Sequence, residues 1–294
     1  MPDLAFLADS DQQFSALHQR LALWNRRRLK PAAPSGDWRS LLRQDAEFSL
    51  VEGDWVEAER RAVATAAQAA PRDADGFVAW FEDLKSTGPG QGDPLFPWLA
   101  EEADMAAFRW FLEQEAAGEA GFDDLVAMAQ VKMPEQAKLE LARNYWDEMG
   151  RGNPKGMHGK MLDDLVRALR LTPSIEATVW PSLALANTMT AFSTSRRYAW
   201  HAIGALGVIE LTAPGRAVRV AKGLRRLGVR GDHRHYFDLH AVLDVKHSEA
   251  WNREVLHSLV AEDPSRARFI AEGALIRLRC GRRCFEAYRA HLWT

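Results

Sequence analysis

HAVLDVKH, at residues 240–247, places two histidines and one aspartate at a helical spacing. Each residue of an α-helix turns the chain by about 100°, so His240, Asp244 and His247 fall within a narrow stripe of one face. Two imidazoles and one carboxylate on one stripe suit a first-row transition metal, iron in particular, when other positions on the metal stay open. The same stripe also arises by chance on solvated helices, so both interpretations are open on this segment alone.

The sequence around this segment predicts helix almost throughout, because Ala, Leu, Glu and Arg dominate and runs of β-branched residues are rare. Prolines and glycines separate the predicted helices, which we place at 10–29, 38–68, 75–86, 98–118, 120–131, 134–150, 155–171, 178–190, 195–211, 214–226, 231–260 and 264–290. The linker-like stretch 86–94 predicts an N-terminal helical extension over residues 1–94 and a helical bundle over residues 95–294. No heptad run, fixed-period repeat or nucleotide-binding glycine motif is present, which favours an all-α fold.

Composition narrows the class of protein further. The chain has 294 residues, of which 47% are hydrophobic and 27% charged, enough for a packed core. No apolar stretch of about 18 residues and no basic, apolar leader is present, so we expect a cytoplasmic protein without a membrane segment. The net charge of −2 gives no general attraction to nucleic acid. Cys280 and Cys284 lie four residues apart, which is not a redox spacing, and we expect reduced structural thiols.

A second pair of metal-ligand types lies in ELARNYWDEMGRGNPKGMHGKMLDDL, at residues 140–165. On an unbroken helix Glu148 and His158 would be about 15 Å apart along the axis and on different faces. Gly150, Pro154 and Gly156 lie between them and should break the helix. Such a break could bring both side chains to one place, although a plain interhelical turn is the simpler interpretation.

Further acids occur in apolar surroundings. Glu210 lies in GALGVIELTAP, at residues 204–214, and a lone acid there either faces solvent or needs a partner. Glu115 and Glu119 lie four residues apart in FRWFLEQEAAGEAGFDDL, at residues 108–125, and so share one helix face. Either could project into a bundle core, whereas most glutamates on such a helix face solvent.

Taken together, the Glu148–His158 segment, the later Glu210 and the H-x-x-x-D-x-x-H segment resemble the haem-oxygenase-like diiron oxidases and oxygenases. These proteins, often described as iron-containing redox enzymes, share the haem-oxygenase architecture but bind two metals in place of haem. The resemblance covers roughly residues 98–290 and implies a haem-oxygenase-like helical bundle. Known members include fatty-acid decarboxylases, enzymes that fragment amino acids, and N-oxygenases.

The resemblance implies a complete ligand set and a reaction class. The implied metal ligands are Glu115, Glu148, His158, Glu210, His240, Asp244 and His247, with Glu119 in reserve for Glu115. The implied cofactors are two Fe ions, or a manganese–iron pair because the ligand types suit both, with O2 as cosubstrate. The implied reaction oxidises a small-molecule substrate that is fatty-acid-like or amino-acid-like. An external electron donor and a homodimer agree with the family, and neither nucleic acid nor membrane is expected as a partner.

Several alternatives use the same residues differently. Trp180, Met189 and Phe192 could line a substrate pocket, or could belong to the core. Glu254 and His257 have the E-x-x-H spacing of ferritin-like carboxylate proteins, but that site needs a second copy of the motif. Relatives of the bundle that bind haem, or that act on thiamin- or quinone-type molecules without metal, would keep the fold and lose the metals. A non-catalytic partner protein with a contact surface in the tryptophan-rich first third is a third hypothesis.

Overall fold

Helix caps and helix breakers determine where the elements of this chain begin and end. A computed structural model describes the backbone of residues 4–294 and the side chains of residues 11–294. Asp73 accepts a hydrogen bond from the amide of Gly76 at 2.7 Å, and Asp104 accepts one from Ala107 at 2.8 Å. These side chains satisfy amide groups that lack a partner in the first turn of a helix. Between residues 4 and 294 the structure has no β-strand, so the predicted all-α class is confirmed.

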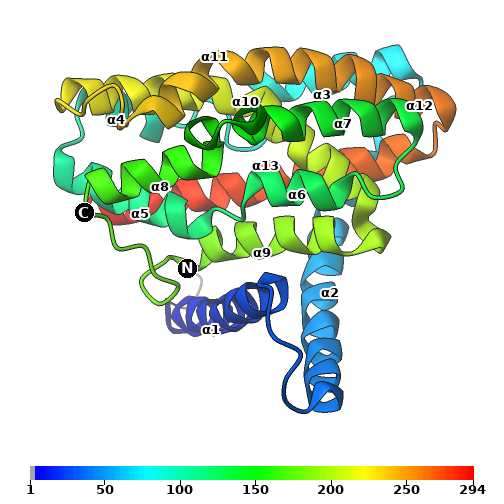
Figure 1. The fold of residues 1–294 in the computed structure, drawn as a ribbon, viewed down its shortest axis with the longest axis horizontal. Coiled ribbons are helices and arrows are strands. Elements are labelled where there is room, and N and C mark those ends of the chain that lie inside the picture. The colour runs from blue at the N-terminus through cyan, green and yellow to red at the C-terminus, as the bar shows by residue number, and fades with distance from the viewer. Residues whose placement is uncertain (1–3) are drawn as a thin grey trace.

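The helices of the first half follow one another with short connections (Figure 1). They are α1 (Leu4–Leu29), α2 (Trp38–Gln68), α3 (Ala74–Thr87), α4 (Leu95–Glu101), α5 (Met105–Gly118), α6 (Phe122–Ala129) and α7 (Glu135–Glu148). The predicted helix 98–118 is wrong in one respect, because the chain breaks before Asp104 and starts α5 there.

The second half contributes the central helices and those that carry His158, Glu210 and the 240–247 segment. They are α8 (His158–Ala168), α9 (Trp180–Thr194), α10 (Ala199–Arg226), α11 (His235–Ala250), α12 (Ser258–Glu262) and α13 (Arg266–Leu292). A π-helical turn at Trp251–His257 joins α11 to α12. We expected a break before Pro214, but α10 runs through it. Packing of α10 against α11 and α13 outweighs the lost backbone hydrogen bond.

The α10–α13 contact sets the centre of the bundle. A Cβ atom on Gly204 would lie 1.8 Å from the carbonyl oxygen of Ile270, and one on Gly273 would lie 2.0 Å from that of His201. The two backbones therefore touch where glycine alone fits. This close approach holds α10, which carries Glu210, between its neighbours.

Helices α1–α3 pack on the bundle: α1 lies against α9, and the first half of α2 extends away from the other helices in Figure 1. Trp55 of α2 and Phe77 of α3 share one hydrophobic core with Phe192 of α9 and Ile203 of α10. A second core lies around Phe108, Leu224 and Tyr288. The division of the chain at residue 94 stays a prediction. Among the described residues, no helix is both long and apolar enough to cross a membrane.

Candidate metal centre

The turn between α7 and α8 brings Glu148 and His158 together. Glu148 is the last residue of α7 and His158 the first of α8, and the chain between them reverses through two short 3-10 turns. Gly150 has a φ of 61°, and a Cβ atom there would lie 2.3 Å from the backbone of Gly156. As a result His158 Nδ1 lies 2.8 Å from Glu148 Oε2, without a suitable hydrogen-bond angle. The predicted helix break is confirmed, and this turn also makes the two side chains neighbours.

The His240–Asp244–His247 stripe on α11 faces this turn. Asp244 and His247 are buried, and His240 is half-buried. The rings of His158 and His240 lie 4.6 Å apart between centroids and nearly perpendicular, at 80°. His240 Nδ1 lies 2.6 Å from the carbonyl oxygen of Tyr236. A hydrogen bond from Nδ1 to that oxygen leaves Nε2 as the acceptor nitrogen of the ring.

Glu210 on α10 is held from two sides. Asn144 Nδ2 donates a hydrogen bond of 2.6 Å to Glu210 Oε1. His247 Nδ1 lies 3.5 Å from the same oxygen, while His247 Nε2 lies 3.2 Å from Asp147 Oδ2. Asp147 thus orients the imidazole so that its other nitrogen faces Glu210.

These side chains form two groups of potential metal donors that share one member. Donor atoms of Glu148, His158 and His240 all lie within 4.8 Å of one another. The same holds for donor atoms of Glu148, Glu210 and His247. A carboxylate has two oxygens, so Glu148 is able to serve both groups at once. Asp244 lies beside them and interacts electrostatically with Glu148 and Glu210.

Burial and mutual repulsion dominate the electrostatics of the cluster. Burial, followed by the Glu210 carboxylate, raises the pKa of Glu148 well above its usual range. Burial, with the charges of Glu210 and Glu148, raises the pKa of Asp244 to about 10. Burial alone would lower the pKa of His247, but the nearby carboxylates of Glu210 and Asp147 raise it to about 9. Acids crowded in this way favour a bound cation.

The residues present fit an iron centre. Asp244 Oδ1, His158 Nδ1 and His247 Nδ1 are buried and have no hydrogen-bond partner among the described protein atoms. Buried polar atoms usually have a hydrogen-bond partner or a ligand. Three such atoms without a partner in one cluster therefore indicate a binding site for a further group. Carboxylates combined with imidazoles are a ligand type that suits iron.

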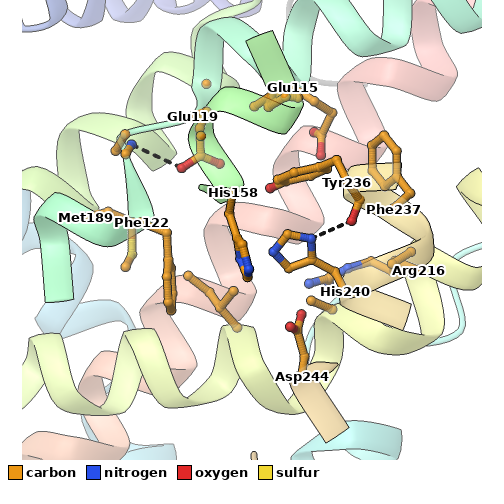
Figure 2. Close-up of a pocket in the computed structure, with 18 of the residues that line it drawn as sticks. Glu115, Glu119, Phe122, His158, Met189, Arg216, Tyr236, Phe237, His240 and Asp244 are labelled. Atoms are coloured by element: carbon orange, nitrogen blue, oxygen red, sulfur yellow. Dashed lines mark hydrogen bonds between the residues drawn. The ribbon is translucent and has the colours of Figure 1, made fainter. Parts of the chain in front are cut away.

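Glu115 of α5 and Glu119, the residue that follows this helix, lie on the wall of the same pocket (Figure 2). Glu115 accepts a hydrogen bond of 2.8 Å from the Tyr288 hydroxyl, and Glu119 accepts one of 3.0 Å from the Gly121 amide. Neither belongs to the two donor groups. Their exposed surface faces the pocket, and burial within the protein raises the pKa of both carboxyls. The assignment of Glu115, with Glu119 in reserve, stays a prediction.

The pocket itself has a volume of about 200 Å³ and reaches the donor groups. Glu148, His158, Glu210, His240 and Asp244 form part of its wall. Much of the remaining wall is apolar and includes Phe96, Phe111, Leu112, Leu162, Leu185, Met189, Ile209, Val220 and Phe237. Met189 both lines this pocket and belongs to the core, whereas Trp180 and Phe192 do not line the pocket. Trp180 instead stacks on Phe14, and Phe192 is core.

Comparison with known proteins agrees with the chemistry of the cluster. The sequence profile of the family described as iron-containing redox enzymes matches residues 109–282, more than half of the chain. The chain belongs to this haem-oxygenase-like family. The matched region runs from α5 to α13 of this iron-containing redox enzyme and includes both donor groups. A search of curated proteins found no match.

Sequence reasoning missed two side chains that position the donors of this enzyme. Asn144 and Asp147 lie on α7, four residues and one residue before Glu148, and they contact Glu210 and His247 respectively. Their position near a suspected ligand was the only signal in the sequence. The alternative E-x-x-H pair lies elsewhere, since half-exposed His257 contacts Asp75 and Glu254 contacts Gln136.

Proposed function

We propose that this enzyme is a non-haem dimetal oxidase or oxygenase that uses O2 to oxidise a small organic substrate. The proposed ligands are Glu148, His158, Glu210, His240, Asp244 and His247, together with one further acid, either Glu115 or Glu119. The proposal rests on one observation above all: Glu148 belongs to both donor groups. A carboxylate shared by two donor sets is suited to bridge a pair of metal ions.

The charge of the cluster supports the same proposal. Glu148, Glu210 and Asp244 bring three carboxylates to one buried place, where they would repel one another without cations. Three imidazoles complete a mixed donor set that leaves positions open for O2. A bound pair of iron ions supplies the redox chemistry by which O2 is reduced and the substrate oxidised.

The protein residues orient the donors and shape the reaction space. Asn144 holds Glu210, Asp147 holds His247, and the Tyr236 carbonyl holds His240, so each donor enters the site with a fixed direction. The apolar wall of the pocket excludes water from the substrate beside the donors. Met189 and Ile209 would contact the body of that substrate.

The electron balance defines one further partner. Oxidation of the substrate releases one electron pair, whereas full reduction of O2 to water takes up two pairs together with protons. The second pair must come from outside the pocket. We therefore propose an external electron donor, of the class of small redox proteins or reduced cofactors, that acts between turnovers.

Anaerobic loading with Fe(II), followed by metal analysis, tests the dimetal site. We expect about two iron ions per chain in the wild type and a strongly reduced content in Glu148→Gln, which weakens both donor groups at once. Glu140→Gln is the matched control, because Glu140 is a buried acid of the same helix that pairs with Arg143 and belongs to neither group. Only trace iron in the folded wild type would contradict the proposal. Manganese analysis of the native protein distinguishes a diiron from a manganese–iron centre.

Titration with haem tests the main alternative. A metal-free or haem-binding protein does not require several unpartnered carboxylate and imidazole atoms around one shared glutamate. We expect no stoichiometric haem binding with the absorption of a ligated haem. Tight haem binding that is lost in His240→Ala, together with no Fe(II) binding, would favour the haem alternative.

A further inference from the structure

The pocket that reaches the donor groups also contains two arginines. Arg216 comes from α10 and Arg277 from α13, and both line the wall. Arg216 lies six residues after Glu210 on the same helix, which is about 9 Å along the axis. Figure 2 shows Arg216 in the same region of the pocket as His240 and Asp244. A molecule in this pocket would therefore meet guanidinium groups as well as the donor groups.

Neither arginine forms an ion pair with an acid among the described residues. Within residues 11–294 no carboxylate forms an ion pair with Arg216 or Arg277, and the buried Nε of Arg277 has no hydrogen-bond partner. Arg216 donates one hydrogen bond of 3.0 Å to the Thr212 hydroxyl. By contrast, Arg283 on α13 pairs with Glu59 at 2.8 Å. Arginine is rarely enclosed without a partner, and these two arginines lack the directly bonded carboxylate that such a position usually requires.

The two acids nearest to these arginines form no ion pair with them. Glu115 interacts electrostatically with both arginines and Glu119 with Arg277, but Glu115 is bonded to the Tyr288 hydroxyl and Glu119 to a backbone amide. Burial and the nearby Arg277 lower the pKa of Arg216 to about 10 against the opposing effect of the Glu115 carboxylate, so Arg216 still carries its charge at neutral pH. Donor groups of both guanidiniums therefore stay free to bind a further carboxylate.

We propose that Arg216 and Arg277 bind the carboxylate of a small monocarboxylic acid, whose apolar body extends along the pocket towards the donor groups. This inference rests on the proposed function, because it names the substrate class of that site. The guanidinium fork matches a carboxylate, and Leu112, Leu185 and Ile209 offer apolar contacts to the rest. A volume of about 200 Å³ fits a small molecule, since it lies below the range typical of larger ligands. A single negative charge suits a pocket that also contains two acids better than a dianion does.

Direct binding measurements test this inference without turnover. Octanoate, octanol, octylamine and octyl phosphate are titrated by calorimetry into the full chain, both metal-free and loaded with Fe(II) in the absence of O2. We expect octanoate to bind at least about tenfold more tightly than the other three. Arg216→Gln and Arg277→Gln should each weaken octanoate binding at least about tenfold.

Matched controls on the same helices are Arg219→Gln and Arg282→Gln, which remove exposed arginines outside the pocket and should leave octanoate affinity unchanged. Thermal unfolding verifies that each variant is folded. If one of the two arginine variants does not fold, the other still tests the inference. Three results would overturn the inference: no octanoate binding to the wild type, unchanged octanoate affinity in a folded arginine variant, or tighter binding of octanol, octylamine or octyl phosphate.

Metal analysis of the same samples separates this inference from the proposed function. We expect the arginine variants to retain the iron content of the wild type while losing octanoate. Arginine-dependent octanoate binding in a wild type that takes up no iron would leave the carboxylate site standing and remove the dimetal function. Full iron content, together with an octanoate affinity that does not depend on the arginines, would overturn the carboxylate site and leave the dimetal function intact.

Discussion

Asn144 donates a hydrogen bond of 2.6 Å to Glu210 across 66 residues of sequence. The amide comes from α7, one turn before Glu148, so the helix that carries the shared carboxylate also orients the acid of α10. Both side chains are buried, at 2% exposure each. This pairing fixes the Glu210 carboxylate relative to Glu148 before any ligand enters.

Asn144→Ala should weaken iron binding without removing a ligand. Loss of such an orienting contact typically lowers metal affinity about 10- to 100-fold. A competition titration with an Fe(II) chelator measures the change. Gln136→Ala is the control, because Gln136 lies on the same helix and contacts Glu254 at the surface. Equal affinities of Asn144→Ala and the wild type would contradict the orienting role.

Gly150→Ala should disrupt the turn that joins Glu148 to His158. The φ of 61° is unfavourable for alanine, and the new Cβ atom would lie 2.3 Å from the backbone of Gly156. We expect a loss of about 2–3 kcal/mol in the free energy of unfolding, measured in urea, and lower iron content. Gly215→Ala on α10 has no atom within 4 Å of the added carbon and should be neutral or stabilising. Equal stability of the two variants would rule out this constraint.

Glu119→Gln and Glu115→Gln should differ in their effect on the metal. The charge of Glu119 helps to raise the pKa of Glu148, whereas Glu115 is bonded to Tyr288. We therefore expect the larger loss of iron content in Glu119→Gln, as determined by metal analysis after anaerobic loading. A larger loss in Glu115→Gln would instead support Glu115 as the ligand from α5.

Glu272→Gln tests a buried ion pair remote from the metal centre. Burial alone would raise the pKa of Glu272, but hydrogen bonds from His201 and Arg60 lower it to about 2 from the model-peptide value of 4.5. A carboxyl with a lowered pKa stabilises the fold above its unfolded pKa, and this stabilisation is lost as the pH falls from 4.5 towards 2. The variant should lose about 3 kcal/mol at pH 7.

Urea unfolding at several pH values measures this effect. The difference between wild type and Glu272→Gln should shrink as the solution becomes more acidic than about pH 4.5. Glu262→Gln, which removes a largely exposed partner of Arg266, should change stability little at any pH. A Glu272→Gln difference that is the same at pH 7 and pH 3 would contradict the linkage.

Local sequence chemistry predicted most helices and one essential turn. The helix 38–68 was predicted with the observed bounds, and the glycine-rich stretch after Glu148 was predicted to break the helix. Pro214 misled the prediction, because the contacts of α10 on both sides could not be read from the local sequence. Trp180 misled the prediction as well: the sequence does not show whether an aromatic side chain faces a pocket or, as Trp180 does, another ring. Only packing makes that choice.

The amino-acid sequence by itself determined the all-α class, the family, and the stripe of His240, Asp244 and His247, because these follow from short-range spacing and composition. The tertiary structure decided which acids meet that stripe, how Asn144 and Asp147 hold them, and that Arg216 and Arg277 enter the same pocket. These relationships join residues far apart along the chain. They depend on the close approach of α10 to α13 and on burial, which is a property of the packed helices and not of any single segment.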